Sequence, residues 1–530
     1  MDGNVPRGIF TLPLELYLCF FQELHPPDLL SLGQTCKLIR NTVNQRHVWE
    51  AALRASCRLN QVFEPSYEPI EELSLGKLQR VALEPWRRSA SFAPQSSRKI
   101  WAMWGKGSTA SSDTSRTETK LEGEMYDGMS FEEVYVVPGG RYVLGMTEKY
   151  VCLWDMGQTG RASWDSGSPK LLHASIMWAT TGSVTWSMSA PTPVNVSSFR
   201  FATCEDDLCF RVFEVGPMPD SCAIREIAKF QGVSPELAPD DFWVQEDRLI
   251  CRFDEGLLVW DFVKSEYIAI PSRGKVSMIT TNGNLVVAWE GSNTGVWTIP
   301  RLKPLEDPSS TLHELLPSNF TNGIDLDTIR DDDHHAPRRQ IHLPSAWYCY
   351  PPHALEYATL HQVGIQKKTI VERYLLNIAG GARACSVKTL VSSSQPMDYI
   401  HAPQYQKPYR MICGGLATMV DRILSPTRGY KTGFIQSVGD GALQRDADKI
   451  EYVFKEIRAV VFQDFSYCPV TGRAAYIPLD PPSIDLANWT ALFTSFLSFI
   501  FGQYWVDTTI SMIPIKGPRV YGIFSMVASL

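Results

Sequence analysis

The chain has 530 residues, of which 44% are hydrophobic and 20% charged, a balance typical of a globular protein with ample material for a core. This length allows roughly three or four domains, or fewer if one of them is a large β architecture. The net charge of −7 provides no broad positive field for a phosphate backbone, so nucleic acid is not expected as a partner.

The cysteines and the N-terminus indicate a reducing compartment. The 12 cysteines are scattered and none forms a C-x-x-C pair, so neither a zinc site nor a disulfide framework is predicted. The opening "MDGNVPRGIF" lacks the apolar region of a secretory signal. We therefore expect the protein in the cytoplasm, the nucleus or both.

Residues 12–49 have the periodicity of short helices. Apolar residues recur every four positions at Leu12, Leu16, Phe20 and Leu24, and Pro13 suits the first turn of a helix. The run His25-Pro26-Pro27 must end this helix, and Asp28 is expected to cap the next one. That second helix would carry the apolar series Leu29, Leu32, Cys36, Ile39 and Val43.

A third short helix is expected to follow, with Trp49, Ala52 and Leu53 on its buried face. Three helices in this short stretch make a core below the size at which a domain is comfortably stable alone. Such a module would gain stability from burying apolar surface against a partner. The alternative is a helical cap on the next domain of the same chain.

The stretch from Leu12 to Trp49 resembles an F-box. It has "LP-x-E-L" from Leu12 to Leu16, then "L-x-P-x-D-L" from Leu24 to Leu29, then Cys36-Lys37 and finally Trp49. It departs from the family pattern at Ile39, where tryptophan is frequent, and at Cys19-Phe20-Phe21, but these positions stay apolar.

The resemblance implies docking to the Skp-type adaptor of an SCF ubiquitin ligase and, through that adaptor, to a cullin scaffold. It favours Leu12, Pro13, Leu16 and the Pro26 turn as interface and leaves Cys36 and Ile39 nearer the internal core. The residues expected to bind the adaptor are Leu12, Pro13, Leu16, Phe20, Leu24, Pro26, Leu29, Leu32 and Trp49.

Beyond this module, residues 1–60, the sequence predicts a helical extension at 61–88 and a linker or flexible loop at 89–125. Residues 70–90 suggest one more helix that stops at Pro85. The segment 89–125 is rich in Ser and Thr, as linkers are. Its "GKGST" at 105–109 lacks the upstream glycine of a phosphate-binding loop.

Residues 126–480 have the pattern of short β-strands. Similar units end at Trp154-Asp155, Phe213, Trp260-Asp261 and Trp297, and such degenerate repetition near 40 residues is typical of propeller blades. The sequence therefore predicts an α + β multidomain chain, a small helical module followed by a mostly β, propeller-like domain of six or seven blades. An irregular array of β-sandwiches is the alternative.

The candidate chemical sites favour surface loops. Residues 330–339, "RDDDHHAPRR", contain carboxylates and imidazoles, but adjacent residues on one loop rarely converge on a single metal ion. Residues 439–449 lack the spacing of a calcium loop. No hydrolase or metalloprotease motif is present in the sequence, so we expect no catalytic residue, metal or cofactor and no enzymatic activity.

The segment 481–530 differs in texture from the rest. Residues 486–506 run without a charge over nearly the length that spans a bilayer, but polar residues interrupt the apolar ones. We expect a buried element; a tail anchor or an aberrant C-terminus are the alternatives, and a membrane is not the expected partner.

Together these features predict a receptor that docks an adaptor through its helical module and holds an unidentified protein target on its β domain for ubiquitination. A scaffold that binds the adaptor without turnover of a target is the second hypothesis, and a propeller enzyme the third.

Overall fold

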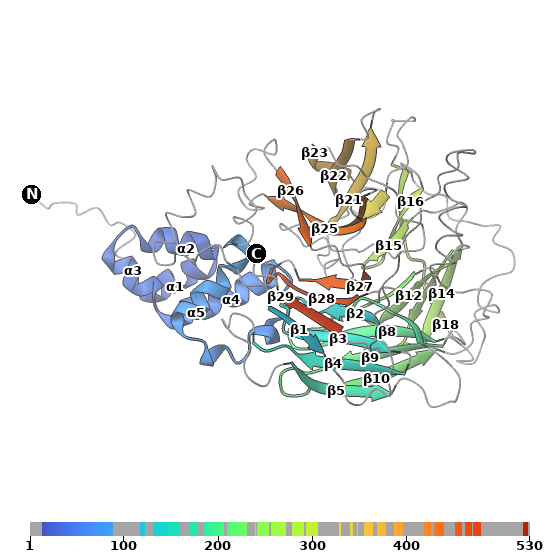
Figure 1. Cartoon of the computed structure of the whole chain (residues 1–530), viewed down its shortest axis with the longest axis horizontal. Coiled ribbons are helices and arrows are strands. Elements are labelled where there is room, and N and C mark those ends of the chain that lie inside the picture. The colour runs from blue at the N-terminus through green and yellow to red at the C-terminus, as the bar shows by residue number, and fades with distance from the viewer. Residues whose placement is uncertain are drawn as a thin grey trace, which may run out of the picture.

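A helical module and a larger β domain make up the described part of the chain, as seen in the computed structural model of all 530 residues (Figure 1). The residues that the structure describes are 13–87, 117–121, 131–147, 149–158, 169–176, 185–205, 209–230, 239, 241–253, 256–271, 278–290, 293–305, 328–329, 340–342, 347, 354–363, 368–377, 386–395, 418–425, 429–438, 451–457, 462–468, 470–478 and 523–527.

Short helices form the N-terminal module. Its elements are α1 (Leu14–Gln22), α2 (Pro26–Gly33), α3 (Lys37–Val43), α4 (Arg46–Leu59), the 3-10 helices η2 (Glu64–Tyr67) and η3 (Ile70–Glu72), and α5 (Leu75–Ala82). The predicted second helix is thus two helices, α2 and α3. The chain turns between them because the Thr35 backbone N–H and hydroxyl both donate to the carbonyl oxygen of Leu32, and Cys36 is extended.

The beginning of α2 differs from the prediction in one respect. His25 caps the helix, Pro26 and Pro27 form its first turn, and Asp28 lies within that turn instead of preceding it. Proline is well suited to this place, because the first N–H groups of a helix have no partner within it and the ring fixes φ near the helical value. The prolines therefore end one helix and also begin the next.

The predicted helix over 70–90 is divided as well. Ile70–Glu72 forms η3, Leu73 is extended, and α5 starts after Ser74 and ends at Ala82, before Pro85. One side of α5 packs on the module, since Leu78 and Val81 are buried.

The β domain consists of antiparallel sheets made from successive stretches of chain. Seven sheets occur among the described residues. The first sheet contains β2 (Phe131–Val136), β3 (Tyr142–Thr147), β4 (Tyr150–Asp155) and β5 (Lys170–Ile176). The second contains β6 (Thr185–Met188), β7 (Thr192–Pro193), β8 (Phe199–Glu205), β9 (Phe210–Val215) and β10 (Ile224–Phe230). The third contains β11 (Asp241–Gln245), β12 (Arg248–Phe253), β13 (Gly256–Asp261), β14 (Glu266–Pro271) and β18 (Lys303–Pro304).

The next three sheets are β15 (Met278–Asn282), β16 (Leu285–Glu290), β17 (Asn293–Thr298) and β19 (Thr328–Ile329); β20 (Gln340–His342), β21 (Ala354–Val363), β22 (Lys368–Asn377) and β23 (Ser386–Gln395); and β24 (Thr418–Ser425), β25 (Gly429–Val438) and β26 (Glu451–Ile457). The seventh has the order β1 (Thr117–Leu121), β29 (Ile523–Val527), β28 (Arg473–Pro478) and β27 (Phe462–Tyr467).

This seventh sheet joins segments from far apart in the sequence. β29 pairs antiparallel with β28 on one side and β1 on the other. Residues 117–121, placed in the linker by the sequence analysis, are therefore a strand, and so are 523–527 of the C-terminal segment. Pairing between segments some 400 residues apart leaves no local pattern in the sequence, which is why both strands were missed.

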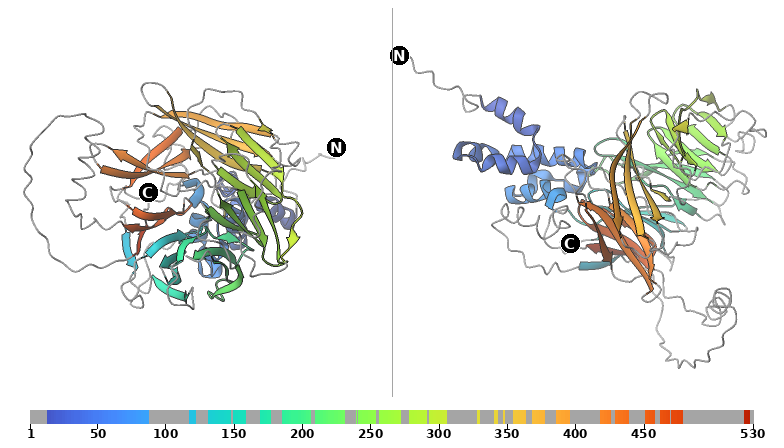
Figure 2. Two further views of the ribbon diagram at one scale, coloured as in Figure 1. Left: turned by 90° about the vertical axis from the view of Figure 1, so that its right-hand side faces the viewer. Right: turned by 90° about the horizontal axis from the view of Figure 1, so that it is seen from above.

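The sheets follow one another around a common centre. Viewed from the side opposite the helices, the colours run in chain order around a ring, and the red strands of the seventh sheet lie beside the cyan strands of the first (Figure 2). The order of short antiparallel meanders, with one sheet completed by both ends of the domain, is a propeller-like arrangement. The exact number of blades stays a prediction.

Buried aromatic and aliphatic residues fill the space between neighbouring sheets. Phe199, Phe201 and Phe213 are buried in the same core as the helices of the N-terminal module. The predicted strand endings Trp154 and Trp260 lie at the ends of β4 and β13, where both indoles are buried. The apolar residues of these strands therefore serve the packing of sheet against sheet.

Several features singled out in the sequence lie outside the described residues, namely 105–109, 330–339, 439–449 and 486–506. Within the described ranges no helix is both long and apolar enough to cross a bilayer.

Candidate adaptor-docking face and its connection to the β domain

Helix α1 presents one apolar side to solvent and another to the core. Leu16 and Phe20 lie one helical turn apart on the same side, and their exposed fractions are 52% and 45%. Phe21, the next residue, is only 2% exposed and packs in the core. Exposing a second apolar side of the helix to water costs free energy. A partner that covers Leu16 and Phe20 would remove this cost.

A third large side chain is exposed on α3. Leu38 has an exposed fraction of 56%, although its neighbour Ile39 is buried. The sequence analysis did not include Leu38. It lies one position before Ile39, outside the apolar series that contains Cys36, Ile39 and Val43. A leucine outside the buried side of a helix is a sign of an exposed apolar residue, and this sign could have identified Leu38.

The remaining predicted docking residues occupy different environments. Pro13 is exposed, whereas Leu24 and Leu32 are half-buried and pack against the core. Pro26 is buried, and Leu29 and Trp49 have exposed fractions of 0%. Leu12 lies outside the described residues. Leu29 and Trp49 therefore hold the helices together in this conformation and offer no surface to a partner.

The segment 61–73, which we call the strap, links the helical module to the β domain. Arg46 of α4 holds one end: its Nη1 donates to the carbonyl oxygen of Leu73 at 2.7 Å and its Nη2 to that of Ile70 at 2.8 Å. At the other end, the indole Nε1 of Trp347 donates to the carbonyl oxygen of Gln61 at 2.7 Å. The strap is therefore fixed at both ends by side chains.

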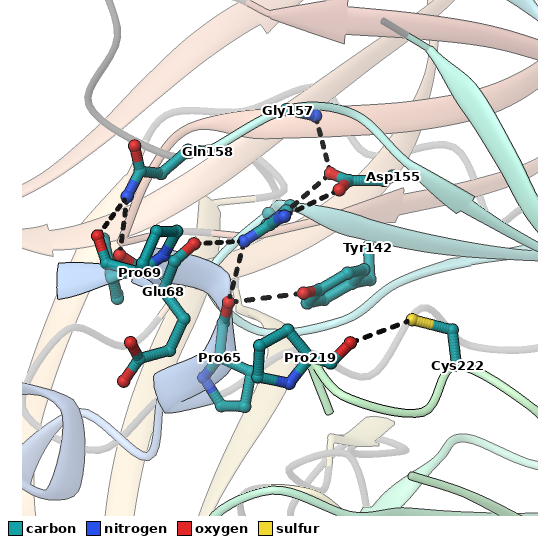
Figure 3. Close-up of polar contacts among 12 residues, drawn as sticks. Pro65, Glu68, Pro69, Tyr142, Asp155, Gly157, Gln158, Pro219 and Cys222 are labelled. Carbon is teal, nitrogen blue, oxygen red and sulfur yellow. Dashed lines mark hydrogen bonds and ion pairs between the residues drawn. The ribbon is translucent and has the colours of Figure 1, made fainter. Parts of the chain in front are cut away.

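The middle of the strap lies against the first sheet of the β domain (Figure 3). The guanidinium of Arg141, just before β3, donates to the carbonyl oxygens of Pro65 and Glu68. The amide of Gln158 donates to the carbonyl oxygens of Tyr67 and Pro69, at 2.8 and 3.2 Å. These two side chains donate to four backbone carbonyl oxygens of the strap, which offsets the loss of water at those groups on burial.

Asp155 orients Arg141. Its carboxylate accepts from Nε at 2.9 Å and from Nη2 at 2.7 Å, a bidentate pair. Burial opposes the charge of Arg141, but the hydrogen bonds and charge of Asp155 outweigh burial and raise the pKa of the guanidinium. Arg141 therefore stays charged while it holds the strap.

Exclusion of water shifts the pKa of two buried side chains in this region, Tyr67 and Arg473. Burial raises the pKa of the Tyr67 hydroxyl well above its usual value. Burial also lowers the pKa of Arg473, in the last sheet, to about 10. The helical module and the β domain thus share a water-excluded junction.

No group of three or more His, Cys, Asp or Glu side chains suited to a metal ion occurs in the described ranges. The cysteines described there are free thiols, and most of them are buried.

Comparison with known proteins agrees with the N-terminal assignment. Residues 9–54 match the family model described as F-box-like. No curated protein matches the chain. Among solved structures, the chain is similar to Hsv2 of Kluyveromyces lactis, with 10% identity and a TM-score of 0.33 over 66% of this chain and 94% of that one. It is also similar to the WD40 domain of SCAP from fission yeast, with 10% identity and a TM-score of 0.29 over 66% of this chain and 82% of that one.

Similarities this low identify no ligand or partner, and the propeller-like arrangement is instead read from the order of the sheets and the ring in Figure 2. An F-box-like domain implies binding to a Skp-type adaptor, and such domains generally belong to subunits without catalytic activity of their own. The chain thus carries an F-box-like domain at residues 9–54, followed by a mostly β, propeller-like domain.

Proposed function

We propose that this protein is a substrate-recognition subunit of an SCF-type ubiquitin ligase. The F-box-like domain docks to the Skp-type adaptor and through it to a cullin, and the β domain holds a protein target. The observation that carries the proposal is the exposed pair Leu16 and Phe20 on α1, within the residues that match the F-box-like family.

In this role the chain makes or breaks no covalent bond. It holds the target near a conjugating enzyme loaded with ubiquitin, so that a step between two separate proteins takes place within one complex. The strap supports this role, because side chains of both the helical module and the β domain bind its backbone. A fixed geometry between the adaptor and the target limits the orientations that the complex must search.

The side chains that we assign to the adaptor interface are narrower than the sequence alone suggested. Leu16 and Phe20 form its centre, and Pro13 and Leu38 are further exposed members. Leu29 and Trp49 act indirectly by fixing the packing of the helices. We place the protein in the cytoplasm, the nucleus or both, where the ligase components operate.

Reconstitution of the ligase tests the proposal. The full chain would be combined with the Skp-type adaptor, a cullin with its RING subunit, the ubiquitin-activating and conjugating enzymes, and proteins captured by the chain from cells with and without proteasome inhibition. We expect ubiquitin chains on a captured protein that disappear when the full chain is left out.

The same experiment separates the ligase from the scaffold hypothesis. A matched reaction would contain the chain with Leu16→Ala and Phe20→Ala, which should still hold the target but lose the adaptor. Adaptor and target that both bind the intact chain, with no ubiquitin on the target, would contradict the ligase function and favour a scaffold.

A further inference from the structure

The turn between β2 and β3 lies between the strap and the last sheet. Its residue Gly139 has a φ of +107°, and a Cβ there would overlap the side chain of Ser66 in the strap. A Cβ on the adjacent Gly140 would overlap Thr471 and Arg473, beside β28 of the last sheet. Both sides of this glycine turn are therefore in close contact, one with the strap and one with the last sheet.

Hydrogen bonds join the first and last sheets at the same place. Arg473 donates through Nη1 to the carbonyl oxygens of Gly140 and Gly157, at 3.0 and 2.9 Å. The backbone N–H of Val136 donates to Oγ of Ser466 at 2.8 Å. Among the described residues, the hydrogen bonds between these two sheets involve side chains, and the two sheets share no backbone ladder. We call this contact the seam.

The strap contacts the glycine turn beside the seam and also reaches beyond it. The backbone N–H of Phe63 donates to the carbonyl oxygen of Pro138 at 2.9 Å, next to the glycine turn. The ring of Phe63 is 2% exposed and makes edge contacts with Tyr142, Phe199 and Trp347, with centroids 6.1, 5.5 and 5.7 Å away. One side chain of the strap thus packs on β3 of the first sheet, on β8 of the second and on Trp347.

We propose that the strap is a clasp that closes the propeller-like domain: Phe63 packs on the first and second sheets, and the strap around it contacts the glycine turn, which in turn contacts the last sheet at the seam. The F-box-like module is then not an independent domain on a tether. The strap that follows its helices is a structural part of the β domain, and release of the strap opens the ring where its first and last sheets meet.

This assignment goes beyond the proposed function, because it concerns closure of the β domain and holds whether or not a target is ubiquitinated. It follows from the burial of Phe63 against the first and second sheets and from the contact of the strap with the glycine turn, which meets the last sheet at the seam. Loss of the Phe63 ring removes its contacts with Tyr142, Phe199 and Trp347 together. Local opening should therefore become easier in the neighbouring sheets as well as in the strap.

Hydrogen exchange by mass spectrometry on the full chain tests the clasp. With Phe63→Ala we expect peptides covering 131–147 and 462–478 to exchange at least about tenfold faster, which corresponds to a loss of about 1.4 kcal/mol against local opening. Peptides covering 241–261 should keep wild-type rates, because the seam does not include them.

A matched control is Phe230→Ala. Phe230 is 1% exposed and packs on Trp260 with ring centroids 5.1 Å apart, in a core cluster formed by the second and third sheets. Its removal should speed exchange in 199–215 and 241–261 and leave 462–478 unchanged. The two variants lose the same kind of buried ring, and peptides covering 462–478 and 241–261 should therefore respond to them in opposite ways.

If Phe63→Ala does not yield a folded chain, Phe63→Leu keeps the test open. Leucine retains much of the apolar volume but lacks the ring edges, so a smaller acceleration in the same peptides is expected. Acceleration confined to residues 61–73, or wild-type rates in 462–478 for the folded Phe63 variant, would overturn the clasp.

Discussion

At the scale of single residues, Cys57 is a buried thiol near the end of α4, where the helix meets the strap. Its thiol is buried, and desolvation together with the nearby charge of Glu64 raises its pKa. The backbone carbonyl of Cys57 also accepts a hydrogen bond from Val62 at the start of the strap, at 2.8 Å. A substitution at Cys57 should therefore affect the packing at the junction between α4 and the strap.

The raised pKa of Cys57 has a consequence at alkaline pH. In the folded chain the thiol keeps its proton, but in the unfolded chain it loses it above about pH 9. Unfolding then releases a proton, so the stabilisation that is complete below pH 9 is lost as pH rises toward the folded pKa. Cys57→Ala should make the fall of unfolding free energy above pH 9 shallower by up to about 1.4 kcal/mol per pH unit.

Urea unfolding in reducing buffer at several pH values from 7 upward would measure this slope. The comparison of slopes separates ionisation from the constant loss of packing that alanine also causes. Equal slopes for Cys57→Ala and the unchanged chain would contradict the assignment.

At the scale of elements, the glycine turn between β2 and β3 leaves no room for a side chain against the strap. Gly139→Ala adds a methyl group that meets Ser66 and Val62 at a φ of +107°, so both strain and overlap oppose it. We expect the free energy of unfolding to fall by about 2 kcal/mol or more, as measured by chemical denaturation.

Gly76 in α5 is the matched control. Its φ requires no glycine, and a Cβ there would have nothing within 4 Å. Because alanine favours a helix over glycine, Gly76→Ala should be neutral or stabilising by up to about 1 kcal/mol. A tolerated Gly139→Ala would show that the strap does not lie where the structure places it.

The local elements were readable from the sequence to a large extent, and the reasons are physical. The strands around Pro138-Gly139-Gly140 follow from alternating apolar residues and a turn, both of them local signals. The α2–α3 break and the start of α2 at Pro26 depend on single backbone hydrogen bonds and caps, which the apolar series did not reveal. The segment predicted as a helical extension, 61–88, contains η2, η3 and α5, but the contacts of the strap with Arg141 and Trp347 are made across the fold and leave no local signal.

At the scale of the whole molecule, the last sheet depends on both ends of the β domain. β29 lies between β1 and β28, so its removal would leave β1 without its pairing strand and β28 paired on one edge only, with β27. Unpaired backbone groups at that position must return to water or remain unsatisfied.

Deletion of residues 523–530 should therefore lower the melting temperature of the full chain by roughly 5 °C or more. Differential scanning calorimetry would measure it, and deletion of 528–530 alone, which leaves β29 intact, is the control. Identical melting temperatures for the two deletions would mean that β29 does not contribute to the closed ring.

The adaptor-binding residues stay a prediction: the resemblance to an F-box favoured Leu12, Pro13, Leu16 and the Pro26 turn, but the structure exposes Pro13 and Leu16 and buries Pro26. Leu29 and Leu16 look alike in sequence, yet the first is buried and the second half-exposed. Only the packing of α1 to α4 on one another decides this, because a small module must use some leucines for its own core.

The central claim is that Leu16 and Phe20 bind the adaptor, and the affinity of the full chain for the Skp-type adaptor tests it most directly. Covering two half-exposed apolar side chains contributes roughly 1 kcal/mol each, so Leu16→Ala with Phe20→Ala should weaken binding about 30-fold. Leu59→Ala is the control, because Leu59 is equally exposed, at 53%, but lies at the end of α4. Calorimetric titration should show the loss for the double variant and an unchanged affinity for Leu59→Ala. An undiminished affinity in a double variant that circular dichroism shows to be folded would contradict the docking face and, with it, the proposed role in a ligase.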